Sequence, residues 1–395
     1  MKSTNVIKNI QRRESVERTS VIERENFISS NYFNSTMLSR MKVDRSIQLH
    51  FDTVDDLVNC ITWSPNGQAI ACGRIGKGAQ VFNPFNENYT QGSELKNSDN
   101  HILVDCIFVP YNSNLLAVAT QRKEIYNWGV QTNSICDEYV KLYDIEAKSR
   151  VAIRSYKFTG ACRHILTTPA LPNCIWFNID MEGHTVAEAD TREKDNFRFF
   201  RIKMKRDDET LNFERSMDIS STETMFVIGS KSEVSLFDRR MISQMKCQPF
   251  KTLKLVNNGL SPVSRAQQIV TQVKFHPYGK KILVTHTRQF HFTHHFVSIH
   301  DDNSSIESLE FPKSNSRLPR LMLRNPSFLG PAGSHVLLDV FFQNYSIVFD
   351  CKTYKYIGKI KFPDQNSSIY TQAHPHYCVI AASNQNQIKF FTPSG

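Results

Sequence analysis

The sequence predicts an all-β fold in which seven copies of one strand-rich unit close into a ring. First, a degenerate pattern recurs: an apolar strand, a turn rich in Pro, Asn or Gly, a small-residue strand, and an apolar strand ending in an aromatic residue and often Asp. Second, the copies end 42 to 63 residues apart, slightly above the roughly 40 to 45 of WD-repeat blades. Third, 395 residues with 27 Phe suffice for one large core. We therefore expect a seven-bladed WD-repeat β-propeller that follows a short N-terminal helical arm.

Residues 1–48 differ from the repeating pattern and are assigned to a helical docking arm, with the propeller over residues 49–395. Ile7 and Ile10 fall on one face of a predicted helix that also carries Arg12 and Arg13. A solvated basic tail is the alternative, but such tails seldom carry so many Ile and Phe residues. We expect a helix that needs a partner to bury its apolar face.

The first copy, residues 57–83, shows the unit most clearly. Its first strand alternates up to Trp63, and the Ser64-Pro65-Asn66-Gly67 segment cannot continue a strand, so the chain must reverse there. Residues 70–72 and 79–82 form the next two strands. The other copies end at Leu142-Tyr143-Asp144, Ala189-Asp190, Leu236-Phe237-Asp238, Ile299-His300-Asp301, Val348-Phe349-Asp350 and Phe390-Phe391-Thr392. Inserted polar loops are expected at about 84–100, 121–138 and 246–268.

Charge and cysteine usage narrow the class of protein. The 48 Lys and Arg against 38 Asp and Glu give a net charge of +10, which favours acidic protein surfaces or nucleic acid without choosing between them. The nine cysteines are scattered without a Cys-x-x-Cys pair, as expected for reduced thiols inside a cell. No apolar signal region and no window near 18 apolar residues is present, so we expect neither secretion by that route nor a membrane span.

Catalytic, metal and nucleotide motifs are not supported. The densest histidine group comprises His286, His291, His294, His295 and His300. We interpret it as a strand of half-exposed histidines, since no cysteine or carboxylate in the local hairpin completes a tetrahedral metal site. Residues 73–78 are read as a hairpin turn, and the basic segment 201–206, beside the acidic 207–209, as a solvated loop or strand. No nucleophile signature occurs, so we expect no enzymatic activity and no cofactor.

Two Asp-x-Arg tripeptides, Asp190-Thr191-Arg192 and Asp238-Arg239-Arg240, close consecutive copies 48 residues apart. An Asp at the end of a strand commonly accepts backbone N–H bonds in the following turn, a role that needs no partner. An Arg two positions later offers a planar five-donor fork, an arrangement enriched at interface anchors. Exposed or blade-bridging arginines are the alternative. Two boxes in adjacent blades favour a docking surface on one rim.

Several segments resemble a known family. They are residues 162–176, with an Arg-x-x-x-Thr-x-Pro run and Pro-Asn-x-x-Trp, the Asp-Thr-Arg-Glu at 190–193, and residues 237–242, 373–381, 10–13 and 25–26. They resemble the WD-repeat substrate receptors of cullin-RING ubiquitin ligases, in particular the WD-and-tetratricopeptide-repeats protein (adipose) and the nuclear receptor interaction protein. The blade-three and blade-seven segments are the most specific.

The resemblance implies a non-catalytic receptor that links a protein substrate to the ligase through its propeller adaptor, the damaged-DNA-binding protein. It places Arg192 and Arg240, with Asp190 and Asp238, against the adaptor, and Ile7, Ile10, Arg12 and Arg13 on the docking helix. We expect a nuclear and cytoplasmic protein. This chain departs from the family in having Ala189 where an aromatic precedes the first box, which is expected to loosen it, and in lacking the tetratricopeptide repeats. Alternatives are a WD-repeat scaffold of a chromatin- or RNA-associated complex, and a structural scaffold without a ligase link.

Overall fold

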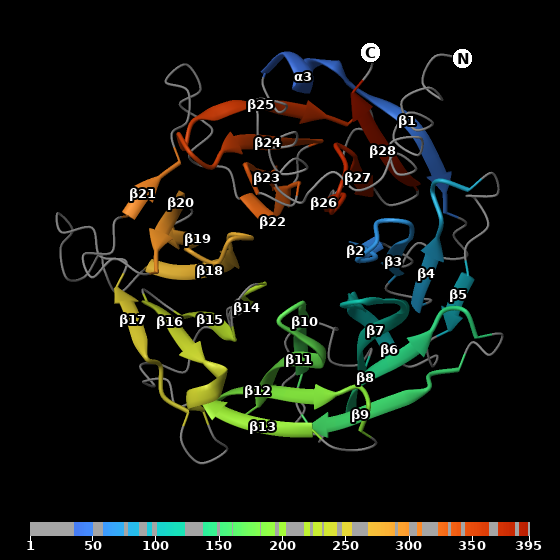
Figure 1. Cartoon of the computed structure of the whole chain (residues 1–395), viewed down its shortest axis with the longest axis vertical. Coiled ribbons are helices and arrows are strands. Elements are labelled where there is room, and N and C mark those ends of the chain that lie inside the picture. Colours follow the sequence, from blue (N-terminus) through green and yellow to red (C-terminus); the bar gives the residue numbers. More distant parts are fainter. Residues whose placement is uncertain are drawn as a thin grey trace, which may run out of the picture.

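The computed structural model describes a closed ring of seven four-stranded antiparallel sheets (Figure 1). The described residues are 35–49, 58–74, 78–86, 93–96, 101–122, 137–147, 151–159, 161–181, 183–193, 197–202, 217–221, 224–230, 233–242, 247–254, 268–288, 291–299, 306–309, 323–330, 333–340, 344–362, 370–383 and 387–393. The predicted seven-bladed propeller is confirmed.

Each sheet is one blade, numbered here in chain order, with its first strand nearest the centre. Blade 1 comprises β2 (Val58–Trp63), β3 (Ile70–Arg74), β4 (Gly78–Phe82) and β5 (Ser93–Lys96). Blade 2 comprises β6 (His101–Val109), β7 (Asn112–Arg122), β8 (Asp137–Asp144) and β9 (Arg154–Thr159). Blade 3 comprises β10 (Ala161–Thr168), β11 (Leu171–Met181), β12 (Gly183–Asp190) and β13 (Phe197–Ile202). Blade 4 comprises β14 (Met217–Ile219), β15 (Met225–Ser230), β16 (Glu233–Asp238) and β17 (Lys251–Lys254), with the short 3-10 helix η1 (Arg239–Met241) after β16.

The remaining blades repeat this order. Blade 5 comprises β18 (Gln268–Phe275), β19 (Lys281–Arg288), β20 (His291–Ser298) and β21 (Ile306–Ser308). Blade 6 comprises β22 (Leu323–Leu329), β23 (His335–Val340), β24 (Tyr345–Asp350) and β25 (Tyr356–Lys361). Blade 7 comprises β26 (Tyr370–Ala373), β27 (Ile380–Ser383), β28 (Gln387–Pro393) and, from the other end of the chain, β1 (Met41–Gln48). The predicted copy ends that are described fall at or next to the ends of the third strands. The outer strands were not part of the predicted pattern, and two of them, β5 and β17, lie in segments predicted as loops.

The ring is closed by the pairing of β1 with β28, from Met41 opposite Pro393 to Gln48 opposite Gln387. The two strands lie side by side in Figure 1. The structure therefore places residues 41–48 in the ring, ahead of the domain boundary predicted after residue 48. Only the six-residue helix α3 (Ser35–Arg40) represents the arm among the described residues, and its Leu38 is buried in the apolar cluster shared by blades 6 and 7. The N-terminal strand thereby completes the sheet of the last blade and leaves no open end of the ring.

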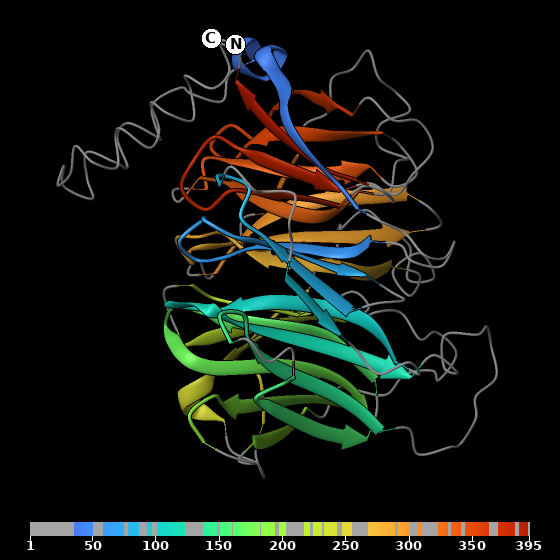
Figure 2. The ribbon, with the colours of Figure 1, turned by 90° about the vertical axis from the view of Figure 1, so that its right-hand side faces the viewer.

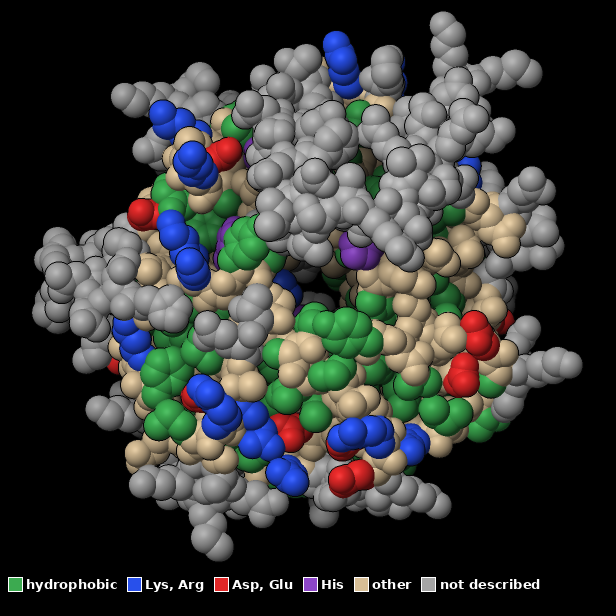
Figure 3. Space-filling model, viewed as in Figure 1, with side chains coloured by type: hydrophobic (Ala, Val, Ile, Leu, Met, Phe, Trp, Pro, Cys, Tyr) green, Lys and Arg blue, Asp and Glu red, His purple; other side chains and the backbone are tan. Residues whose placement is uncertain are grey.

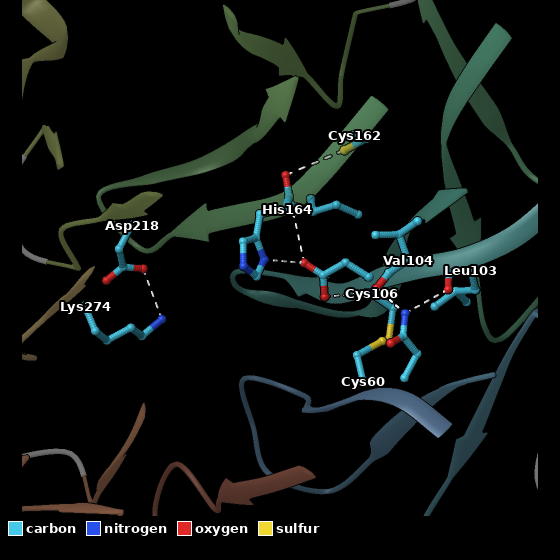
Figure 4. A network of polar contacts seen from close by, with 11 residues as sticks. Cys60, Leu103, Val104, Cys106, Cys162, His164, Asp218 and Lys274 are labelled. Atoms are coloured by element: carbon cyan, nitrogen blue, oxygen red, sulfur yellow. Dashed lines mark hydrogen bonds and ion pairs between the residues drawn. The ribbon is translucent and has the colours of Figure 1, made fainter. Parts of the chain in front are cut away.

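The core is divided among the seams between blades. Seven clusters of buried apolar side chains are present among the described residues, and each joins two neighbouring blades. Polar contacts close the same seams nearer the centre. The Asp105 carboxylate of blade 2 accepts the Ile165 N–H of blade 3 at 3.0 Å, and Asp218 of blade 4 accepts the Phe275 N–H of blade 5 at 2.7 Å. Figure 4 shows this inner region of the ring.

Turn chemistry explains why the chain reverses where predicted. Gly67 has φ +71°, a conformation that glycine adopts without cost. A Cβ added there would lie 2.3 Å from the His374 ring, and that ring contacts the Gly67 carbonyl through Nε2 at 2.9 Å. The first turn of blade 1 is therefore locked against blade 7.

The turns divide between two faces of the ring. Because the strands of a blade are antiparallel, the turns between strands one and two share a face with those between strands three and four. In Figure 2 this face is on the left, where the β6–β7 hairpin and η1 lie. Both Asp-x-Arg boxes follow third strands, so both lie on this face.

Candidate docking rim

Asp190, the last residue of β12, organises the first box. Its Oδ1 accepts the backbone N–H of Arg192 at 2.9 Å and the Arg192 Nε–H at 3.0 Å, and its Oδ2 accepts from Nη2 at 2.6 Å. One carboxylate therefore holds both the turn and the guanidinium. The Arg192 side chain is still 68% exposed.

Asp238, the last residue of β16, makes the same arrangement in blade 4. Its Oδ1 accepts the Arg240 backbone N–H at 2.9 Å and Nε–H at 3.1 Å, while Oδ2 accepts from Nη2 at 2.7 Å. The Thr224 hydroxyl also donates to Oδ1 at 3.2 Å, and the carboxylate caps η1. The Arg240 side chain is 76% exposed. The two boxes have the same geometry within a few tenths of an ångström.

The two carboxylates remain ionised throughout the physiological range. Side-chain hydrogen bonds from Arg240, followed in effect by its backbone N–H, lower the pKa of Asp238 to about 2. The side-chain hydrogen bond from Arg192 likewise lowers the pKa of Asp190. Each guanidinium is consequently fixed in direction by a permanent local charge, and its exposed edge faces solvent.

A comparison among blades shows that the Asp and the Arg of each box have separate roles. The same turn recurs with an Asp or Asn acceptor in three other blades: Asn83 accepts from Phe85, Asp144 from Glu146, and Asp350 from Lys352, all through the backbone N–H two residues on. The acceptor is therefore a general turn device, as the sequence predicted. In these five turns, the residue two positions after the acceptor is an arginine only in blades 3 and 4, so the turn itself does not require an arginine there.

The blade-3 box is held from both neighbours. Arg154 of blade 2 donates to the carbonyls of Thr191, Arg192 (3.1 Å) and Glu193 (2.8 Å). From blade 4, Arg239 donates to both carboxylate oxygens of Glu188. The turn that follows β12 and the turn that follows β16 are thus linked across the seam between blades 3 and 4.

Arg239 itself is buried in the seam rather than offered to a partner. Its side chain is 20% exposed and that of Glu188 is 10% exposed. Its guanidinium lies 5.2 Å from the centre of the Phe200 ring and 6.0 Å from that of Trp176. The middle residue of the second box is therefore the blade-bridging arginine.

Apolar side chains are exposed on the same face. The exposed large hydrophobic residues among the described ones include Tyr111, Val151, Ile153, Met241, Phe250 and Tyr278. All six lie on turns between strands one and two or three and four, in blades 2, 4 and 5. Figure 3 shows Lys and Arg side chains beside hydrophobic ones over the lower blades of this face. We call this surface, with Arg192 and Arg240, the docking rim.

Tyr111 is the most exposed of these apolar residues, at 78%, and its backbone is unusual. It has φ +56°, in the two-residue turn where Val109 pairs with Asn112. The corresponding hairpins of blades 1 and 5 place Gly67 and Gly279 at positive φ. A bulky residue in that conformation costs about 1 kcal/mol, so the turn presents the Tyr111 ring to solvent at a conformational cost.

Other sequence-predicted residues have distinct positions. Ala189 is buried in the cluster between blades 2 and 3, and the box that follows it keeps the hydrogen bonds of the blade-4 box, so the expected loosening is not seen. The aromatic at the matching place in blade 4, Phe237, stacks on Phe226 at 4.8 Å. The docking-helix residues Ile7, Ile10, Arg12 and Arg13 lie outside the described residues.

Three of the five clustered histidines have described side chains and all three are buried, so the prediction of half exposure was wrong for them. His286, His294 and His295 are at most 5% exposed. Burial lowers their pKa values to about 4, 3 and 4, so they are neutral at pH 7. Within the described part of the chain no three potential metal ligands come together. Arg74 at the end of β3 pairs with Gly78 at the start of β4, as expected for the two ends of the predicted hairpin turn.

Sequence reasoning missed Arg154, Glu188 and the exposed apolar turn residues. The one local signal was the Pro110-Tyr111-Asn112 turn, in which an aromatic occupies a position suited to glycine. Arg154 and Glu188 carry no local signal, since their partners lie 37 to 51 residues away.

Comparisons with known proteins support the fold. No family model matches the sequence, and no curated protein matches it. The β-propeller domain of Myceliophteria thermophila Cps50 (Swd1) is similar with a TM-score of 0.62 and 12% identity, over 90% of this chain and 100% of that chain. A chain of the mitotic checkpoint complex is similar with a TM-score of 0.62 and 13% identity, over 90% of this chain and 96% of that one. At such identity the likeness shows the fold alone, a WD-repeat β-propeller. No described helix is long and apolar enough to cross a membrane.

Proposed function

We propose that this chain is a non-catalytic substrate receptor that docks, through its rim, on the propeller adaptor of a cullin-RING ubiquitin ligase. The general role, a protein-interaction platform, follows the usual role of WD-repeat propellers, although the fold alone does not fix a function. The specific role, docking on the ligase adaptor, is supported by the pair of matching Asp-x-Arg boxes on adjacent blades.

The composition of the rim suits a protein partner. Arg and Tyr are enriched at interface hot spots, and exposed Met and Phe supply apolar area around them. Each guanidinium is already oriented by its own aspartate, so binding would order little additional side chain. The box directs the exposed edge of the fork outward, where carbonyl or carboxylate groups of a partner would meet it.

In the proposed mechanism the rim holds the adaptor and the other surfaces of the ring hold a protein substrate. No bond is made or broken by residues of this chain. The acceleration of ubiquitin transfer would come from proximity, because both reactants are held in one assembly.

The test is binding of the purified chain to the purified adaptor, the damaged-DNA-binding protein, by titration calorimetry. We expect Arg192→Ala together with Arg240→Ala to weaken binding at least tenfold, since interface arginines commonly contribute more than about 1.4 kcal/mol each. A matched control is Glu146→Ala with Lys352→Ala, which alters the same position of the same turn in blades 2 and 6. The control should bind as the parent does.

A lysine pair separates charge from geometry. Arg192→Lys with Arg240→Lys keeps both charges but removes the fork, so it should also weaken binding. Equal binding by all four proteins, or no binding by the parent, would reject the ligase proposal. If the parent instead bound nucleic acid with a steep salt dependence, the chromatin- or RNA-associated scaffold would take its place.

A further inference from the structure

A pair of thiols lies in the seam between blades 1 and 2. Cys60 in β2 and Cys106 in β6 come from the innermost strands of neighbouring blades, and their Sγ atoms are 3.4 Å apart. Figure 4 shows the two side chains reaching toward each other between the ribbons of β2 and β6. Both cysteines are free. A disulfide has an S–S length of about 2.05 Å, so a shift of little more than an ångström would bring the sulfurs to bonding distance.

The surrounding fold fixes this approach. The amide of Asn59, the residue before Cys60, donates to the carbonyls of Leu103 at 3.0 Å and Val104 at 2.8 Å. These bonds tie β2 to β6 beside the sulfurs. Gly73 leaves the necessary space, because a Cβ at that position would lie 2.5 Å from Cys60 Sγ and 2.3 Å from a Leu103 methyl. The thiol pair is therefore a consequence of how the two blades are joined.

The two sulfurs differ in accessibility. Cys106 is 3% exposed, whereas Cys60 is half-buried. The hydrogen bond with Cys60, together with burial, raises the pKa of the Cys106 thiol well above its usual value. Cys60 is consequently the sulfur that a small oxidant reaches first, and Cys106 is a protonated neighbour held against it.

We propose that Cys60 and Cys106 form an oxidisable dithiol site that takes small peroxides and closes to an inter-blade disulfide. The Cys60 thiolate attacks one oxygen of hydrogen peroxide, the O–O bond breaks, and the products are a sulfenic acid and hydroxide. The Cys106 sulfur, losing its proton, then attacks the Cys60 sulfur, forming the S–S bond and releasing water. In total two thiols and one hydrogen peroxide give one disulfide and two waters, the sulfurs being oxidised and the peroxide reduced.

The product would join blade 1 to blade 2 covalently. Since the two cysteines are 46 residues apart, the bond closes a long loop in the unfolded chain and should raise the thermal midpoint. The proposal does not depend on the proposed function.

Peptide mapping of the folded protein tests the proposal. The reduced chain is treated with hydrogen peroxide, its remaining thiols are alkylated, and the digest is analysed by mass spectrometry without reduction. We expect a peptide pair linked through Cys60 and Cys106, an intact mass lower by two hydrogen atoms, and a raised thermal midpoint. The variant Cys174→Ala removes another half-buried cysteine and should keep the link.

Two further samples make the result decisive. In Cys106→Ala, Cys60 should accumulate as a sulfenic acid that dimedone labels, because the second thiol is gone. In the chain unfolded by guanidinium, disulfides should form without a preference for the Cys60–Cys106 pair. The proposal is overturned if folded parent protein gives dimedone-labelled or over-oxidised Cys60 without the linked peptide, or if the same link predominates in the unfolded chain.

Discussion

The bridge between Arg239 and Glu188 should be the strongest single polar tie beneath the docking rim. It is bidentate, both side chains are largely buried, and the guanidinium packs on two aromatic rings. Removing one partner of such a pair leaves the other charge buried and alone, which costs about 3 kcal/mol. Unfolding entropy near 2.1 cal/mol/K per residue gives about 0.8 kcal/mol/K for a chain of this length. Arg239→Met or Glu188→Gln should therefore lower the melting temperature by about 4 °C.

A double-mutant cycle tests this reasoning by differential scanning calorimetry. The double variant should melt close to either single variant, because the second change removes a charge that the first left unpaired; the coupling should therefore be about 3 kcal/mol. Arg240→Ala is the control, since its side chain is 76% exposed and exposed ion pairs contribute little to stability, and it should leave the melting temperature nearly unchanged. Single variants that each shift melting by less than one degree, or a double variant whose loss equals the sum, would refute the account of the seam.

Three more predictions concern the same surface and the buried histidines. Arg154→Gln should weaken adaptor binding without a change at Arg192 itself, because three carbonyls of the blade-3 turn lose their donor; unchanged affinity by calorimetry would contradict this. Tyr111→Asn should change stability by less than about 0.5 kcal/mol, since Asn tolerates positive φ, yet weaken partner binding; a loss of stability without loss of binding would show that Tyr111 serves the fold and not a partner. His294, whose pKa is lowered to about 3, resists protonation in the fold while the unfolded chain takes a proton below about pH 6.5. Stability should therefore fall from pH 7 to pH 5 by about 2 kcal/mol for this residue, and His294→Asn should show a smaller decrease in melting temperature over that range.

Local chemistry made the boxes predictable. Asp190 and Asp238 follow third strands and accept from a backbone N–H two residues on, which a short sequence window reveals. The turn glycines and the copy ends were predictable for the same reason. Arg154 and Glu188 act across seams, and no local pattern identifies a partner in the next blade.

The burial of side chains was harder to predict than the sheet face to which they point. Strand alternation gave the faces of the blade-5 histidines but suggested half exposure, whereas neighbouring blades cover both faces of a blade. His294 and His295 point in different directions and are both buried.

Outer strands were hard to predict because they bury few side chains. In β1, Ile47 is the one residue that is fully buried, and the other positions are polar or partly exposed. A strand with so little apolar alternation resembles a polar arm in sequence. Its place in the ring follows from backbone pairing with β28, which side-chain pattern does not encode.

The most direct test of the central claim is the affinity of the purified chain for the purified adaptor, measured side by side for the parent, the Arg192→Ala/Arg240→Ala variant and the Glu146→Ala/Lys352→Ala variant. We expect at least a tenfold loss of affinity for the arginine variant alone, with all three proteins melting at similar temperatures. Equal affinities for the three proteins, or equal losses in both variants, would show that the paired arginines do not form the docking surface.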